Sequence, residues 1–182
     1  MGRKPNQNRN KDRSAATRAA RQAAVQALYE IEISGATFDS VFMDYFHDRW
    51  TGLAGQTTGE AMDRKKFSDL VKGVSDRRPL YDRMVGEALD QGRQFSGLDV
   101  LLAQILRSGA HELLAETKVP ARVVIAEYVG IAHAFYAGQE PSLVNGVLDR
   151  IAHVVRTEEL GAKEPGAEDV SSEDTGAKDE PQ

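Results

Sequence analysis

The stretch PSLVNGVLDRIA, residues 141–152, carries two conflicting structural signals. Asn-Gly between apolar residues is a strong signal for a two-residue β-hairpin loop. The apolar residues of the stretch instead recur at helical spacing, at Leu143, Val144, Val147, Leu148 and Ile151. Pro141 suits the first turn of a helix, and the preceding segments also have helical patterns. We therefore interpret the stretch as a helix whose interior contains Asn145 and Gly146.

Gly146 is an unfavourable residue for a helix interior. A glycine there costs about 1 kcal/mol relative to alanine. The close approach of another helix or of a ligand commonly compensates for such a glycine. We expect another helix to pack against Gly146, and Asn145 to face outward.

The rest of the central sequence has the same apolar spacing of about 3.6 residues, without the alternation typical of strands. The predicted fold class is therefore all-α, a bundle of about seven helices with short connections. We expect helices at 15–34 after an N-cap at Ser14, at 38–50, at 63–74, from Pro79 onward, at 98–114, from Pro120 to Gly138, and from Pro141 onward.

Charge is distributed unevenly along the 182 residues, although the net charge is only −5. Residues 1–21 contain seven basic residues and one acid, whereas residues 157–182 contain nine acids and two lysines. Apolar residues are scarce at both ends. We predict a disordered basic arm at 1–13, a folded helical domain at 14–156, and a disordered acidic tail at 157–182.

The composition excludes several classes of protein. The chain has no cysteine, so it has neither disulfides nor a cysteine nucleophile. No apolar run approaches the roughly 20 residues of a membrane span, and no apolar segment of a secretory signal follows the basic N-terminus. We expect a cytoplasmic protein. The four histidines form no metal-binding pair, and glycine-rich phosphate loops and Ser-His-acid patterns are absent, so we predict no metal, no cofactor and no enzymatic activity.

The helix at 15–34 has two distinct sides at 100° per residue. One side is apolar, and Arg18, Arg21, Gln22 and Tyr29 gather on the opposite side, around Val25. This second side is either an ordinary solvated surface or an RNA-binding surface, because arginines hold phosphates and an aromatic ring stacks on a base. We expect both arginines to lie away from the core. The basic arm, with Arg13 at its end, joins this side.

Four blocks in order along the chain resemble the NusB family. They are RAARQAAVQALYEIEISG (18–35), FSDLVKGV (67–74), ILRSGAHELL (105–114), and VPARVVIAEYVGIAHAF (119–135) followed by LVNGVLDRI (143–151). From first to last they span residues 18–151, nearly the whole length of the predicted folded domain. The resemblance implies an all-helical protein of two small packed bundles without enzymatic activity. It further implies binding of boxA RNA together with NusE, a ribosomal small-subunit protein, in an RNA polymerase antitermination complex that acts notably in rRNA operons.

The resemblance also implies particular site residues. The RNA-contacting positions correspond to Arg18, Arg21 and Tyr29 in the first helix, and to Leu143, Asn145 and Gly146 in the last. Arg13 and Gln22 extend the basic surface as further RNA-binding candidates. Leu102 and Arg107 in the central helix are candidates for contact with the protein partner. Homodimers that cover the RNA-binding face also occur in the family.

Two alternatives remain from the sequence. A helical adaptor would use the basic arm to bind RNA or acidic surfaces without sequence specificity. NusB-like bundles also occur as N-terminal domains of ribosomal RNA methyltransferases, but this chain has no glycine-rich cofactor segment. Comparing the binding of boxA RNA and scrambled RNA, with and without NusE, distinguishes the first alternative from the specific factor.

Overall fold

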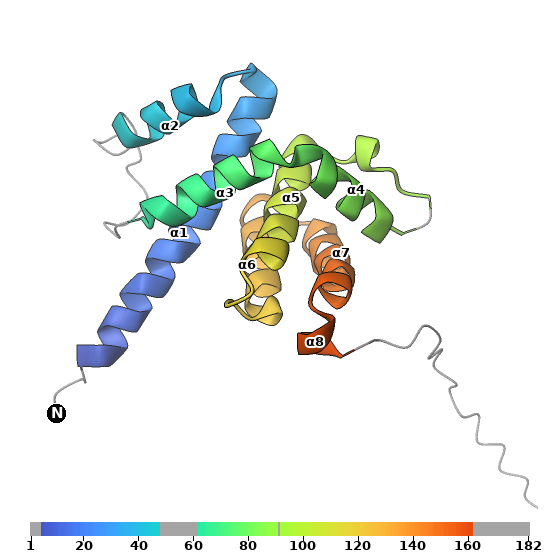
Figure 1. Ribbon diagram of the computed structural model, residues 1–182. Coiled ribbons are helices and arrows are strands. Elements are labelled where there is room, and N and C mark those ends of the chain that lie inside the picture. Colours follow the sequence, from blue (N-terminus) through green and yellow to red (C-terminus); the bar gives the residue numbers. More distant parts are fainter. Residues whose placement is uncertain (1–4, 48–61, 91, 162–182) are drawn as a thin grey trace, which may run out of the picture.

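The computed structural model describes residues 5–47, 62–90 and 92–161, and these residues contain only helices and connections, without a β-strand (Figure 1). The predicted all-α class is confirmed. The elements in chain order are α1 (Pro5–Ser34), α2 (Phe38–His47), α3 (Arg64–Asp76), α4 (Arg78–Ala88), the short 3-10 helix η2 (Phe95–Gly97), α5 (Val100–Ala115), α6 (Ala121–Phe135), α7 (Glu140–Val155) and α8 (Thr157–Leu160).

The first apolar cluster joins the three N-terminal helices. One face of α1 provides small residues, which allow α3 to approach closely, and α2 and α3 provide the larger side chains. Asp63 caps the start of α3 by accepting a hydrogen bond from the backbone N of Lys66. The buried members are Ala20, Ala24, Ala27, Leu28, Val41, Phe67, Leu70, Val71 and Val74.

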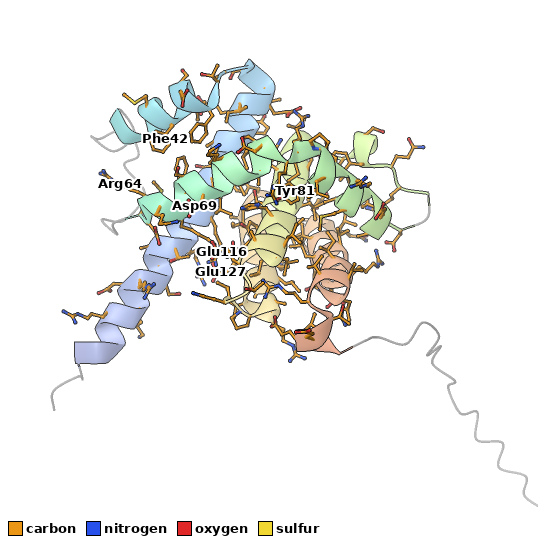
Figure 2. The ribbon with its side chains drawn as sticks, in the orientation of Figure 1. Phe42, Arg64, Asp69, Tyr81, Glu116 and Glu127 are labelled. Atoms are coloured by element: carbon orange, nitrogen blue, oxygen red, sulfur yellow. The ribbon has the colours of Figure 1, made fainter. Side chains whose placement is uncertain are left out.

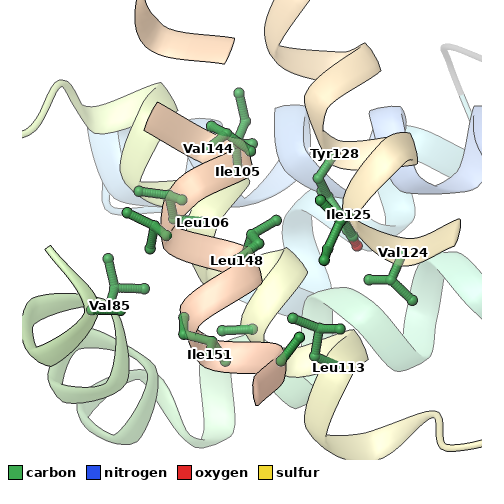
Figure 3. Close-up of a cluster of buried hydrophobic side chains, with 14 of the residues drawn as sticks. Val85, Ile105, Leu106, Leu113, Val124, Ile125, Tyr128, Val144, Leu148 and Ile151 are labelled. Carbon is green, nitrogen blue, oxygen red and sulfur yellow. The ribbon is translucent and has the colours of Figure 1, made fainter. Parts of the chain in front are cut away.

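The second apolar cluster surrounds α5, the helix at the centre of the molecule (Figure 3). Every residue from 102 to 110 is buried, because α1, α3, α4, α6 and α7 all contact this helix. Gly109 permits a close contact with α7, since a Cβ atom there would lie 2.6 Å from Cδ1 of Leu148. Asp99 caps the start of α5 by accepting hydrogen bonds from the backbone N atoms of Leu101 and Leu102.

The two clusters share α1. The face that carries Ala20 and Ala24 belongs to the first cluster, whereas Val25 is buried in the second. In Figure 1, α2 lies on the side of α1 away from α5, and α3 crosses α1 toward the helices around α5. The predicted pair of packed bundles is therefore present, and α1 connects them.

The predicted ends of the helical body differ from the structure. Residues 5–13 are helical as part of α1, so the expectations of a disordered arm over this range and of an N-cap at Ser14 are wrong. At the other end α8 occupies 157–160, the first part of the predicted tail. Residues 1–4, 48–61, 91 and 162–182 lie outside the described residues, so the predicted tail is described only as far as Gly161.

Arg156 explains why the folded body continues into α8. Its buried guanidinium donates from Nε to the carbonyl O of Leu113 at 2.6 Å and from Nη2 to that of Glu116 at 2.8 Å. Glu159 of α8 accepts a hydrogen bond from the backbone N of Ala121 at 2.8 Å. These bonds satisfy the last carbonyl groups of α5 and the first amide of α6, which have no partner within their own helices.

In the described part of the chain, no helix has the length and apolar character required to cross a membrane.

Candidate nucleic-acid interface

A buried carboxylate, Glu112 of α5, organises the polar contacts between α1, α3, α5 and α6. Arg21 of α1 donates to it from Nη2 at 2.6 Å and from Nε at 3.0 Å. Nζ of Lys66 on α3 lies 2.9 Å from Oε1 of Glu112, and the hydroxyl of Tyr128 on α6 donates a hydrogen bond to Glu112 at 3.0 Å. Three other helices therefore converge on one side chain of α5.

These contacts compensate for the burial of the negative charge on Glu112, which would otherwise be unfavourable. Burial acts to raise the pKa of Glu112, but hydrogen bonds and the positive charges of Arg21 and Lys66 outweigh it and hold that pKa below its ordinary value. Burial, followed by the negative charge of Glu112, raises the pKa of Tyr128 well above its ordinary value. Tyr128 is therefore a neutral donor, and Glu112 is an ionised acceptor.

A second carboxylate, Glu127 of α6, connects this buried network to the surface. Nη1 of Arg21 lies 3.5 Å from Glu127 Oε2. Arg18 of α1 donates to Glu127 from Nε at 3.1 Å and from Nη2 at 3.0 Å, and its side chain is 68% exposed. The hydrogen bond to Glu127 is the main reason that the pKa of Arg18 is raised. Figure 2 labels Glu127 on the part of the bundle that faces α1.

The expected position of Arg21 is wrong. Arg21 is only 4% exposed, because the side of α1 opposite the alanines packs on α5 and α6 instead of facing solvent. Its guanidinium is committed to Glu112 and Glu127 and is not presented to a ligand. The other candidates of α1 do reach solvent, since Arg13 and Arg18 are exposed, Tyr29 is 39% exposed and Gln22 is half-buried.

The Asn-Gly pair lies inside α7, as the helical interpretation predicts. Asn145 is exposed, which agrees with its expected outward direction. The expectation that a helix packs against Gly146 is wrong, because a Cβ atom placed there would meet nothing within 4 Å. Leu143, one turn earlier, is half-buried. Asn145 and Gly146 therefore belong to an open surface of α7.

The two candidate partner-binding residues are not on the surface. Leu102 is buried in the cluster around α5, and Arg107 is buried with it. Arg107 donates from Nε to Asp82 of α4 and stacks with its guanidinium carbon 5.1 Å from the ring centre of Phe95. The central helix offers no solvent-facing side at these positions because neighbouring helices cover it. Neither side chain is presented to a protein partner.

Two acidic residues of the site, Glu112 and Glu127, were missed by sequence reasoning. Both lie on helices whose neighbouring positions are strongly apolar, which is the signal for a paired buried charge. A second signal is Val25, an apolar residue one turn after Arg21, which indicates that this side of α1 is also covered. Among the described residues, no cluster of three or more side chains suited to a metal ion occurs.

The fold and these surfaces define a class of small all-helical proteins in which one long N-terminal helix connects two apolar clusters and contributes to a polar face. The chain belongs to the NusB family, whose family model matches residues 18–153. The fold and the ordered sequence blocks thus agree with the expected family.

Similar proteins support the assignment. The transcription antitermination protein NusB of Bradyrhizobium sp. (strain ORS 278) is 40% identical over 158 residues, which cover 85% of this chain and 92% of the relative. The protein of the same name from Brucella ovis is 43% identical over 144 residues, or 79% of this chain and 84% of the relative. The solved structure of T. maritima NusB matches with a TM-score of 0.61 at 23% identity, covering 75% and 89% of the two chains, and supports the fold.

Proposed function

We propose that this protein is a transcription antitermination factor that binds boxA RNA together with NusE and helps RNA polymerase pass terminators, notably in rRNA operons. The observation that carries this proposal is membership of the NusB family, whose similar members are named transcription antitermination proteins. The protein acts by binding and not by catalysis. Its contribution is a surface that holds a single RNA strand.

The RNA-binding surface of this proposal combines residues from both ends of the folded chain. α1 contributes Arg13, Arg18, Gln22 and Tyr29, and α7 contributes Asn145, Gly146 and the half-buried Leu143. α6 contacts both of these helices and lies between their contributions. Arginine side chains bind phosphates, and an exposed tyrosine ring offers a stacking platform for a base.

Arg18 is well suited to a phosphate contact. Its two hydrogen bonds to Glu127 use Nε and one hydrogen of Nη2 of Arg18. The Nη1 hydrogens and the second Nη2 hydrogen of Arg18 remain for another acceptor. The pairing fixes the direction of the guanidinium before RNA arrives, which lowers the entropy lost on binding. Arg21 supports this arrangement from inside, because it contacts both Glu112 and Glu127.

The test compares the affinity of the full chain for boxA RNA and for a scrambled RNA of equal composition, with and without NusE. We expect tighter binding of boxA and a further gain with NusE. Tyr29→Ala should weaken boxA binding more than Tyr29→Phe, since a stacked base is worth about 1–3 kcal/mol. Equal affinity for both RNAs, unchanged by NusE, would instead identify a helical adaptor without sequence specificity.

A further inference from the structure

A groove of about 460 Å³ lies between α6 and α7, beside the helix surface that carries Asn145. Its floor is apolar, formed by the buried Ile125 and the half-buried Val129. Ala126 and Gly130 leave it open, and a Cβ atom at Gly130 would meet nothing within 4 Å. The volume falls within the range of about 300–1,000 Å³ typical of small-ligand sites.

Polar groups surround this floor, and three of them have no partner. Arg122, His133 and Asn145 are exposed and make no side-chain hydrogen bond or ion pair with any described residue. The fourth, Asp149, lies 3.5 Å from Nδ1 of His153. By contrast, Arg18 and Arg21 nearby are both held by carboxylates. Unpartnered donors around a hydrophobic floor indicate a ligand with a flat apolar face and several acceptors.

The groove continues the surface proposed for RNA. Ala126 and Gly130 flank Glu127 on α6, and Glu127 holds Arg18 of α1. Asn145 on the opposite side of the groove belongs to the proposed RNA-binding part of α7. A strand that contacts Arg18 and then Asn145 therefore crosses α6 at the groove.

We propose that this groove binds one unpaired nucleotide of the RNA strand, with the base lying on Ile125 and Val129. Asn145 hydrogen-bonds the edge of the base, and Arg122 and His133 contact its sugar-phosphate. The inference rests on the proposed RNA-binding function. An RNA nucleotide fits better than the apolar face of a protein helix, because the carbonyl groups of that helix are already paired within it. Such a face would cover the three donors without supplying acceptors, which is costly.

Gly130→Leu is the decisive variant, because its side chain enters open space above the floor and fills the groove. We expect its melting temperature to stay at or above that of the original protein, since leucine is the better helix former. Its affinity for boxA RNA should fall roughly 5-fold or more, the loss expected for one stacked base. Arg122→Gln should also weaken binding, whereas Arg83→Gln, at an exposed arginine of α4, provides the matched control.

A positional measurement identifies the bound nucleotide. RNAs carrying 2-aminopurine at one position at a time report stacking by their fluorescence. We expect one position to change on binding to the original protein and to lose this change with Gly130→Leu. Unchanged affinity and fluorescence with Gly130→Leu, in a protein that still binds boxA, would overturn the groove but not the proposed function.

The remaining outcomes are also decisive. A loss confined to binding in the presence of NusE, with RNA binding alone unchanged, would assign the groove to a protein partner and contradict the inference. Failure of the original protein to bind boxA RNA, with or without NusE, would overturn the proposed function and the inference together.

Discussion

Arg21 of α1 forms an ion pair with Glu112 of α5 in the interior, with Nη2 and Oε1 only 2.6 Å apart. Both side chains are buried, at 5% and 0% exposure. The pair lies where α1 contacts both apolar clusters. Lys66 of α3, a helix of the first cluster, forms a second ion pair with Glu112. A residue expected to bind RNA is therefore a structural contact between the two halves of the protein.

Replacing Arg21 by alanine should lower the free energy of unfolding. Arg21→Ala leaves the buried carboxylate of Glu112 with only Lys66 and Tyr128 as partners, and breaking a buried pair costs up to about 3–5 kcal/mol. Urea denaturation followed by circular dichroism measures the change. Arg18→Ala is the matched control, because the exposed pair of Arg18 contributes at most about 1 kcal/mol. Equal, small losses for both variants would show that the buried pair does not stabilise the fold.

Arg18 should affect RNA binding and its salt dependence. Each phosphate neutralised on a single strand contributes about 0.7 to the slope of log affinity against log salt concentration. Arg18→Gln should therefore make this slope shallower by about that amount. Titrations of boxA RNA at several salt concentrations provide the measurement, with Arg83→Gln on α4 for comparison. A slope that is unchanged by Arg18→Gln would mean that other residues hold the phosphate backbone.

The sequence predicted the fold well because apolar spacing is a local property. Each expected helix exists, and Pro79, Pro120 and Pro141 lie at or beside helix starts. The Asn-Gly pair also followed this rule, since the apolar residues of α7 bury one face whatever Asn145 and Gly146 prefer locally. The C-terminal end of the body was predicted poorly, because Arg156 at the start of α8 is held by carbonyl groups far away in the sequence.

Burial of charged residues could not be predicted in the same way. Periodicity shows which residues of α1 share a side, but not whether a second layer covers that side. Arg21 and Arg18 are three positions apart on one helix, and yet α5 and α6 cover only the first. The same limit applies to Leu102 and Arg107, whose burial depends on how many helices surround α5, and to the groove, which exists only where α6 and α7 meet.

Gly146 tests the surface of α7. Because the space around it is open, Gly146→Ala should stabilise the fold by up to about 1 kcal/mol through its better helix propensity. Gly146→Leu should also be tolerated, whereas packing against a helix would have cost roughly 1–3 kcal/mol. We expect Leu to reduce boxA affinity while the melting temperature stays near that of the original protein. If the Gly146→Leu protein binds boxA RNA as tightly as the original protein, Gly146 is not part of the RNA-binding surface.

Gly73 of α3 is a glycine that the packing requires. A Cβ atom there would lie 2.6 Å from Nε2 of His111, whose ring is fixed by a 2.7 Å hydrogen bond between Nδ1 and the hydroxyl of Tyr81. Gly73→Ala should destabilise the fold by roughly 1–3 kcal/mol through overpacking, despite the better helix propensity of alanine. Thermal melts compare it with Gly86→Ala, where the nearest atom would be 3.9 Å away. Gly73→Ala combined with His111→Ala should lose less than the sum of the two changes.

His111 should make stability depend on pH. Burial, followed by the positive charge of Lys66, lowers the pKa of His111 below its ordinary value of 6.5. Glu112 and Glu116 oppose this shift in pKa, and Arg77 reinforces it, but burial dominates. The unfolded chain therefore takes up a proton at this position more readily than the folded protein. The free energy of unfolding should fall as the pH drops below about 6.5, and level off once the folded pKa is also passed.

Urea midpoints between pH 8 and pH 5 measure this dependence, on the chain alone and without RNA. His111→Gln removes the titrating ring, so the fall in stability over this range should become smaller in that variant. The carboxylates whose pKa values are lowered, Asp99 and Glu112, also lose stabilisation as the pH falls, but they do so below their ordinary pKa values of 3.8 and 4.5. They do not account for a change that begins near 6.5. A dependence that is the same in His111→Gln as in the original protein would assign it to a group other than His111.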